Sequence, residues 1–268
     1  MSQIFFHTGL SKTGSTFLQQ QIFPKLGHIY YLPTKKYRRA LDVIPGITAD
    51  KILISREFDQ QFEREIISFS KAYPAAFPII VFREPGSWAV SNYKRFVKNG
   101  HHFSFTEFID IQGDKGHFKI QDFSYSRYIQ LLEKHFEQPP LILIYDDLKK
   151  NPHQFLNKIG KYLDIPLEFQ TFNLTPSHVS YDENALKLVR KLSSKIQFQK
   201  KLEVHRKPKG FLYNLYANII RYSILYSSKI LPEFLFPKEE LISAQEVEAV
   251  SKFFADEWNF VKEKASKF

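Results

Sequence analysis

The 268-residue chain contains no cysteine. This absence excludes a disulfide scaffold, a thiolate metal site and a cysteine nucleophile, and it fits a reducing compartment. The nine histidines show no HExxH or comparable spacing, so we predict no metal site. The N-terminus has no basic segment followed by a long apolar run, and we therefore expect neither a signal peptide nor an N-terminal anchor.

Long apolar runs are also missing. No window reaches the roughly 20 apolar residues of a membrane-spanning helix, and the nearest, residues 210–228, contains Arg221. We therefore expect a cytoplasmic protein. Hydrophobic residues nevertheless make up 43% of the chain, with 27 phenylalanines and 14 tyrosines, which is enough for a packed core and excludes global disorder.

The net charge of +10 is unevenly distributed. Twelve basic residues and only two acidic ones lie between Lys187 and Lys238, so this stretch carries the whole excess. Such a basic region favours an anionic partner, either a phosphorylated cofactor, an acidic glycan, a nucleic acid or an anionic lipid. A solvated helical face is the alternative interpretation.

Short β-rich segments alternate with helical patterns in the first two thirds of the chain. Buried strands are predicted at Ile4–His7, Lys51–Ser55, Pro78–Arg83 and Leu141–Tyr145. Helices are predicted at Gly14–Ile22, Gln60–Ser70, Gly86–Val97, Phe155–Leu163, Asn184–Gln199, Phe211–Lys229 and Ala244–Lys262, with one more inside His117–Phe136. The alternation predicts an α/β fold, a P-loop-like parallel sheet flanked by helices with a helical C-terminal extension. We expect one domain over residues 1–268, with an α/β core at 1–166 and a helical part at 167–268.

The first strand is followed by Gly9-Leu10-Ser11-Lys12-Thr13-Gly14-Ser15-Thr16, which opens a helix. Backbone N–H groups at a helix N-terminus bind phosphate, and Gly14 lets the backbone approach it closely. Ser15 and Thr16 add hydroxyl donors, and Lys12 adds a positive charge. The two glycines have the spacing of a nucleotide-triphosphatase P-loop, but Ser15 occupies the position of its lysine. The pattern predicts a phosphate site whose cation lies earlier in the loop.

A second loop follows the strand Pro78–Arg83. Arg83 stands at the carboxyl end of this strand, where a guanidinium suits a phosphate. Ser91 lies eight residues later, about two turns into the next helix, and offers a hydroxyl to the same group. Together the two loops predict sites for two phosphates at opposite ends of a nucleotide, although Arg83 alone is also compatible with pairing to Glu84.

At these loops the chain resembles the sulfotransferases that use 3′-phosphoadenosine 5′-phosphosulfate (PAPS), in particular bacterial, carbohydrate- or glycan-type members. Their first loop reads roughly PKSGT[TS], and their second is an apolar strand followed by R-[DE]-P with a serine eight residues after the arginine. The chain differs mildly, with Ser11 where proline is common and Glu84 where aspartate is common. The resemblance extends over about residues 2–166.

The resemblance implies a role for each loop. It assigns the 5′-phosphosulfate to Lys12, Thr13, Gly14, Ser15 and Thr16, and it gives Lys12 the additional task of stabilising the oxygen that leaves the sulfuryl group. It assigns the 3′-phosphate to Arg83 and Ser91. The cofactor would be PAPS, with 3′-phosphoadenosine 5′-phosphate (PAP) as its product and no metal. Residues 206–210 resemble a basic loop that closes on the 3′-phosphate in the family.

Transfer to a hydroxyl requires a proton acceptor within hydrogen-bond reach. Members of the family use a histidine or a glutamate, and a Ser-x-Glu string stands at the corresponding place in bacterial and glycan-type members. The resemblance therefore favours Glu57, after the strand Lys51–Ser55, as the catalytic base. A surface glutamate paired with Arg56 or Arg64 is the alternative. We interpret His7 as a buried, hydrogen-bonded histidine.

The acceptor is expected to be a hydroxyl-bearing saccharide or lipid-linked saccharide, that is, a glycan or glycolipid. The basic, aromatic segment Lys35–Arg39 is a candidate contact for an acidic glycan. The segment Phe211–Lys229 has the composition of a helix lying on anionic lipid, which would place the protein peripherally on the inner membrane face. A core or dimer helix is the alternative interpretation.

Two other functions compete with sulfuryl transfer. A P-loop kinase of a small molecule or saccharide would use Asp146, after the strand Leu141–Tyr145, to hold magnesium. The early position of Lys12 and the Arg83 loop argue against it. The positive charge also suggests a nucleic-acid binder, but no recognition motif supports one, and we expect no nucleic-acid partner.

Overall fold

The computed structural model describes residues 2–175, 181–196, 208–227, 232, 234 and 236–267. They form two compact units. The first comprises Met1–Trp88, Gln121–Ser177 and Phe253–Phe268, and the second comprises Ala89–Ile120 and His178–Lys252. Helix α4, Pro85–Lys98, crosses the boundary without a break. The expected single domain, divided at residue 166, stays a prediction.

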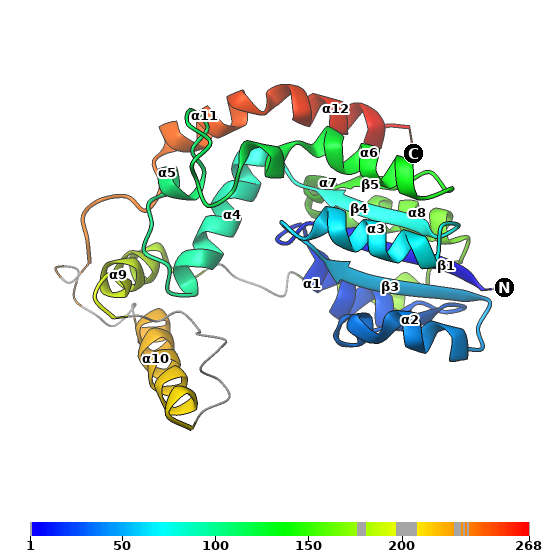
Figure 1. Cartoon of the computed structure of the whole chain (residues 1–268), viewed down its shortest axis with the longest axis horizontal. Helices are drawn as coiled ribbons and strands as arrows, with labels where there is room; N and C mark the ends of the chain where they lie inside the picture. Colours follow the sequence, from blue (N-terminus) through cyan, green and yellow to red (C-terminus); the bar gives the residue numbers. More distant parts are fainter. Residues whose placement is uncertain are drawn as a thin grey trace. The chain divides into compact units, whose positions relative to one another are not determined.

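Five strands form one parallel sheet in the first unit, in the spatial order β2-β3-β1-β4-β5 (Figure 1). Their bounds are β1 Gln3–Gly9, β2 Tyr30–Leu32, β3 Lys51–Glu57, β4 Phe77–Phe82 and β5 Leu141–Ile144. Parallel neighbours require crossover connections, which place helices on both faces of the sheet. The predicted α/β class with a helix-flanked parallel sheet is confirmed.

The helices of the first unit are α1 Ser15–Phe17, α2 Ala40–Val43, α3 Phe62–Ala72, α6 Tyr125–His135, α7 Tyr145–Lys150, α8 Pro152–Leu163 and α12 Ala255–Ala265. A π-helix, η1 Leu18–Ile22, continues α1. The 3-10 helices are η2 Phe23–Lys25, η3 Thr34–Arg39, η4 Ile44–Gly46, η5 Ile120–Phe123 and η6 Phe169–Thr171.

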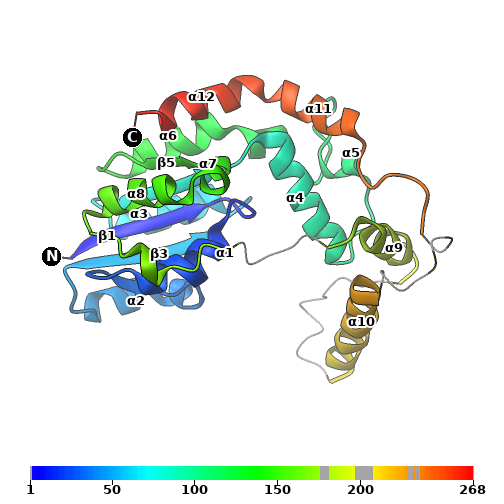
Figure 2. The same cartoon turned by 180° about the vertical axis from the view of Figure 1, so that it is seen from behind.

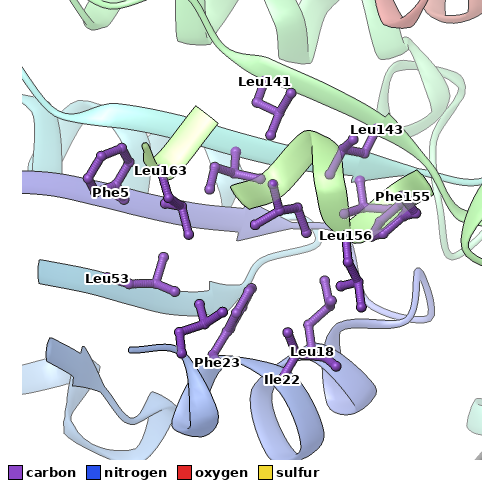
Figure 3. Packing of buried hydrophobic residues seen from close by; sticks show 14 of the residues in the cluster. Phe5, Leu18, Ile22, Phe23, Leu53, Leu141, Leu143, Phe155, Leu156 and Leu163 are labelled. Carbon is purple, nitrogen blue, oxygen red and sulfur yellow. The ribbon is translucent and has the colours of Figure 1, made fainter. Parts of the chain in front are cut away.

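The central strand β1 is buried on both faces of the sheet. Successive side chains of a strand point to opposite faces, so Phe5 and Phe6 enter different cores. Phe5 packs in a cluster with side chains of β3, β4, β5, η1 and α8 (Figure 3). On the other face, the ring of Phe6 lies 4.2 Å from that of Phe69 in α3 and 6.4 Å from that of Phe136. Figures 1 and 2 accordingly show α3 and α8 on opposite faces of the sheet.

Several predicted boundaries were wrong. The strand predicted to end at Arg83 ends at Phe82, and the one predicted to end at Tyr145 ends at Ile144, because α7 begins there. The helix predicted at Ala244–Lys262 is two helices, which are separated at Phe254, and the ring of Phe254 stacks on Phe123 at 4.8 Å. The short edge strand β2 was not predicted, because three residues are too few for an alternating pattern.

The second unit is helical and contains α5 Phe105–Phe108, α9 Glu183–Ser193, α10 Pro208–Ser227 and most of α11 Ala244–Phe253. Arg190 of α9 donates to the Tyr93 hydroxyl at 3.0 Å and thereby joins α9 to α4. Among the described residues no helix has the length and apolar character needed to cross a membrane. The last residues of the helices predicted at Asn184–Gln199 and Phe211–Lys229 lie outside the described residues.

One carboxylate ties the C-terminal helix α12 to the start of α6. Glu257 accepts hydrogen bonds from the Ser126 N–H at 2.7 Å and from the hydroxyls of Ser126 and Ser124 at 2.9 and 3.2 Å. Removing this acceptor leaves the Ser126 N–H without its partner and the two hydroxyls with only each other, 3.4 Å apart, so Glu257→Ala should lower the free energy of unfolding by about 1–3 kcal/mol. Urea denaturation measures the loss.

The matched control lies on the same helix. Glu263 is exposed, and among the described residues its carboxylate pairs only with Lys267, at 3.1 Å. Because exposed ion pairs contribute little, Glu263→Ala should change the free energy of unfolding by less than about 1 kcal/mol. Equal losses in the two variants would show that the Glu257 contacts do not hold α12 in place.

Candidate functional site

The loops predicted to bind anions lie at the switch point of the sheet. From β1 the chain builds β2 and β3 on one side and β4 and β5 on the other, so the loops after β1 and β4 open at the same edge. Ligands of open α/β sheets bind at such a point, outside the carboxyl ends of the strands. The Arg83 guanidinium Nη1 donates to the backbone carbonyl of Lys12 at 3.2 Å, so the structure brings the two loops into contact.

The first loop turns through two left-handed residues, Lys12 at φ 66° and Gly14 at φ 88°. Such a conformation is unfavourable for lysine and persists only where neighbours hold it. Asp59 accepts hydrogen bonds from the N–H and the hydroxyl of Ser11, both at 3.0 Å, and the Trp88 indole N–H donates to the Ser11 carbonyl at 2.8 Å. These contacts fix the loop before any ligand arrives.

Position 14 requires a glycine, both because of its backbone conformation and because of the residues packed against it. A Cβ at this position would lie 3.0 Å from the Leu148 side chain and 3.1 Å from the Tyr145 ring, closer than most real Cβ contacts. Both neighbours belong to α7, which follows β5. The left-handed conformation adds a second penalty for any residue with a side chain. The loop therefore closes tightly against α7.

Arg83 follows β4 directly and is held from two sides. Its Nε donates to the Ser87 hydroxyl at 2.7 Å, and its guanidinium carbon lies 4.9 Å from the centre of the Tyr145 ring. Burial lowers the pKa of Arg83, but an arginine remains charged at any physiological pH. The predicted alternative, pairing with Glu84, is wrong in the structure, because the Glu84 carboxylate accepts the N–H groups of Gly86 and Ser87 at 3.0 and 2.6 Å.

The remaining predicted cofactor residues lie on the helices that follow the loops. Thr13 and Ser15 are buried, and Thr16 is half-buried in α1. The Thr13 hydroxyl donates to the Leu10 carbonyl at 2.7 Å and lies 3.4 Å from the Ser15 hydroxyl. Ser91 lies on α4 in the part that belongs to the second unit, and its role toward a 3′-phosphate stays a prediction.

Glu57, the predicted base, is the last residue of β3. The register of the sheet places it opposite Gly9, at the first residue of the phosphate loop, and its side chain is half-buried. Neighbouring residues of parallel strands share a face, so Glu57 lies on the same side of the sheet as Ser55 and His7. The structure thus brings Glu57 to the edge where both anion loops lie, and its catalytic role stays a prediction.

His7 is fully buried, as the sequence predicts. Its Nδ1 lies 2.7 Å from the Ser55 hydroxyl, which also accepts a hydrogen bond from the Gln19 amide at 2.9 Å. Burial lowers the pKa of His7 to about 3, so the ring is neutral at physiological pH. A ring with this pKa is a poor proton acceptor, which leaves Glu57 as the better candidate for the base.

Sequence reasoning missed four residues that shape the site, namely Gln19, Asp59, Trp88 and Tyr145. Asp59 carried a usable signal, since it follows the carboxyl end of a predicted strand, where site residues gather. Tyr145 was assigned to the end of a strand, and its contact with Gly14 depends on α7 folding back. In the part of the chain that the structure describes, no group of three or more His, Asp or Glu side chains could hold a metal ion, and independence from metal stays a prediction.

Comparison with known proteins adds the following matches. A family model described as a sulfotransferase domain matches residues 4–211. The crystal structure of a sulfotransferase from Alicyclobacillus acidocaldarius is similar with a TM-score of 0.53 and 15% identity, over 67% of this chain and 87% of that chain. Mouse sulfotransferase SULT7A1 complexed with PAP is similar with a TM-score of 0.47 and 13% identity, over 99% of this chain and 89% of that chain. No curated protein matches the sequence.

The tight closure of the first loop against α7 can be tested at Gly14. Gly14→Ala combines a left-handed backbone with contacts of 3.0–3.1 Å and should lower the free energy of unfolding. We expect a loss of about 1–3 kcal/mol. In Gly46→Ala the new Cβ meets no atom of the described residues within 4 Å, so its unfolding free energy should stay close to that of the wild type. Similar losses in both variants, measured by urea denaturation, would contradict the assigned role of Gly14.

Proposed function

The chain belongs to the sulfotransferase domain family, and we propose that it transfers the sulfuryl group of PAPS to a hydroxyl of an acceptor. The observation that carries the proposal is the contact between Arg83 and the carbonyl of Lys12. This contact fixes a half-buried cation beside the first phosphate loop, where a nucleotide with phosphates at both ends requires a second anion site. ATP has no phosphate at the 3′ position.

The residues of the first unit fit a nucleotide with two separate anionic groups. Two carboxylates beside the loops, those of Asp59 and Glu84, both accept backbone N–H groups. The carboxylates of Asp146 and Glu84 act on Arg83 from a distance, but Arg83 forms no ion pair with any described residue and its Nη2 makes no hydrogen bond with one. Its guanidinium can therefore still bind an anion. A guanidinium of this kind suits phosphate oxygens. Gly14 meanwhile lets the backbone of the first loop approach the other anionic group.

PAPS supplies an activated sulfuryl group. In the proposed reaction the acceptor oxygen forms a bond to sulfur, and the bond from sulfur to the bridging oxygen breaks, its electron pair remaining on the 5′-phosphate. Glu57 receives the proton of the acceptor hydroxyl. Lys12 stabilises the negative charge that develops on the leaving oxygen, and the preformed loop holds the reacting groups in position.

The position of the loop lysine disfavours the kinase alternative. Its magnesium ligand would be Asp146, near the start of α7, where the Asp146 carboxylate acts against the lowering of the pKa of Arg83. Asp146 is also 3.7 Å from the Lys149 ammonium group on the same helix. The cation of the first loop is Lys12, in the middle of the turn and three residues before the usual lysine position.

The acceptor that we propose is an acidic saccharide. Helix η3 begins beside the end of β3, because the Thr34 hydroxyl donates to the Ser55 carbonyl at 2.9 Å, two residues before Glu57. It carries four exposed cations, Lys35, Lys36, Arg38 and Arg39. Tyr37 does not belong to this surface, since its ring stacks on Phe6 and its hydroxyl donates to Glu65. An acceptor with carboxylate or sulfate groups would meet these cations close to the proposed base.

A lipid-linked saccharide remains within this proposal because of helix α10. Large apolar side chains are exposed along it, at Leu212, Tyr213, Leu215, Tyr216, Ile219 and Tyr226. Such a helix suits contact with a membrane surface more than with water. Three basic residues near this helix lie outside the described residues, namely Arg206, Lys207 and Lys229.

One prediction of the proposed function concerns the nucleotide. A ligand that binds only the folded state raises the melting temperature, so PAP should stabilise the protein more than adenosine 5′-phosphate, which lacks only the 3′-phosphate. Arg83→Ala should abolish this difference, whereas Arg64→Ala, an exposed arginine paired with Glu65, should preserve it. Selective stabilisation by ATP with magnesium would favour the kinase, and no stabilisation by any nucleotide would contradict the proposed site.

The second prediction concerns the chemistry. Glu57→Gln should lower kcat by about 100-fold or more while the dissociation constant for PAP stays unchanged, because only the proton acceptor is lost. Lys12→Ala should lower kcat by about 100–1,000-fold, because the leaving oxygen loses its charge partner. Transfer of radiolabelled sulfate from PAPS to heparan-type oligosaccharides measures both. Glu168→Gln, an exposed glutamate, is the control, and equal rates in Glu57→Gln and wild type would assign the base elsewhere.

A further inference from the structure

Three polar atoms converge beside Gly9, at the start of the phosphate loop. A Cβ built on Gly9 would lie 3.4 Å from Nε2 of His7, 3.4 Å from the Ser15 hydroxyl and 3.6 Å from the Thr13 hydroxyl. The three side chains come from β1, α1 and the loop between them. All three are buried, and the sequence provides no side chain at Gly9 to fill the spot between them.

Among the described residues, only one of the two ring nitrogens of His7 has a hydrogen-bond partner. Nδ1 pairs with Ser55, whose hydroxyl is held by Gln19 of the π-helix η1, so the ring orientation is fixed. Nε2 is fully buried and has no hydrogen-bond partner among the described residues. A buried polar atom without a partner costs about 1–3 kcal/mol, so native structures rarely keep one without a bound group to satisfy it.

The chemistry of the three atoms selects the group that fits between them. The Thr13 hydroxyl donates its only proton to the Leu10 carbonyl, so toward this spot it offers lone pairs alone. A phosphate oxygen cannot donate to it, but a water molecule can. Water can also pair with Nε2 of the neutral ring and with the Ser15 hydroxyl, which gives it the two to four polar partners that buried waters need.

We propose that His7 is a positioning residue, and that its Nε2, with the Thr13 and Ser15 hydroxyls, holds one water molecule beside Gly9 that orients the Ser15 hydroxyl toward the 5′-phosphate. This inference rests on the proposed function and on the predicted binding of the 5′-phosphate by Ser15. His7 acts through the water and the loop and does not contact the nucleotide. The lowered pKa of His7, about 3, agrees with a ring that stays neutral while it performs this role.

Two substitutions at His7 distinguish the roles of its two ring nitrogens. In His7→Asn the amide replaces Nδ1 and can keep the bond to Ser55, but nothing reaches the spot beside Gly9. In His7→Gln the longer amide replaces Nε2. Binding of PAP, measured by calorimetry, should weaken by about tenfold in His7→Asn and by less than about threefold in His7→Gln, since one lost hydrogen bond to a buried site is worth roughly one factor of ten.

Gly9→Ala tests the water itself. Its methyl group would make ordinary contacts of 3.4–3.6 Å, so it fits the loop while it occupies the space of the water. PAP binding should weaken by about tenfold, as in His7→Asn, although His7 is unchanged. Adding His7→Asn to Gly9→Ala should then change PAP binding little further, because both substitutions interrupt the same chain of contacts. Additive losses would overturn the proposal.

The outcomes distinguish this inference from the proposed function. If the wild type does not bind PAP, the proposed function fails. If the wild type binds PAP and His7→Asn binds it equally well, only the role of His7 fails. Should His7→Asn not fold, nitrogen-15 NMR of the wild type decides, with the His7 signals identified by their absence from His7→Gln. PAP should shift the Nε2 resonance more than the Nδ1 resonance, and an unchanged Nε2 resonance would overturn the proposal.

Discussion

The burial of β1 on both faces of the sheet is the constraint on which the site depends. A strand with helices on both sides has no freedom to move, so the residue at its carboxyl end is held in one place. Gly9 and the start of the loop are therefore fixed in position. The loop has a left-handed backbone conformation at Lys12 and Gly14. Two anchors, Asp59 and Trp88, maintain a turn that a free peptide would not populate.

At the same edge of the sheet, Arg83 forms no ion pair with a described residue. Carboxylates next to the loops accept backbone N–H groups, which stabilises helix α4 and the first loop without neutralising Arg83. Stacking on Tyr145 and the bond to Ser87 hold the guanidinium in place by contacts that carry no opposing charge. A half-buried guanidinium that forms no ion pair with a described residue can still bind a phosphate, and this is the physical reason for assigning it an anionic ligand.

The neutral ring of His7 lies among polar side chains at the start of the phosphate loop. It connects Ser55 and Gln19 on one side with the hydroxyls of Thr13 and Ser15 on the other. Ser55 in turn lies two residues before Glu57 on the same face of β3, so the proposed base and the proposed phosphate site share one supporting row of side chains. Substitutions of the supporting residues His7 and Ser55 should therefore affect nucleotide binding and catalysis together.

The sequence alone determined the features that depend on local pattern. Apolar runs revealed four of the five strands, and the glycine spacing with Lys12 indicated the phosphate loop, because both signals lie within a few consecutive residues. Only the tertiary structure decided which distant residues serve that loop. Asp59, Trp88 and Tyr145 reach it from three other segments, and Glu84 is engaged by the N-terminus of α4 rather than by Arg83. The order of the strands placed these residues at one edge, and that order is a result of packing between segments far apart in the chain, which no local pattern records.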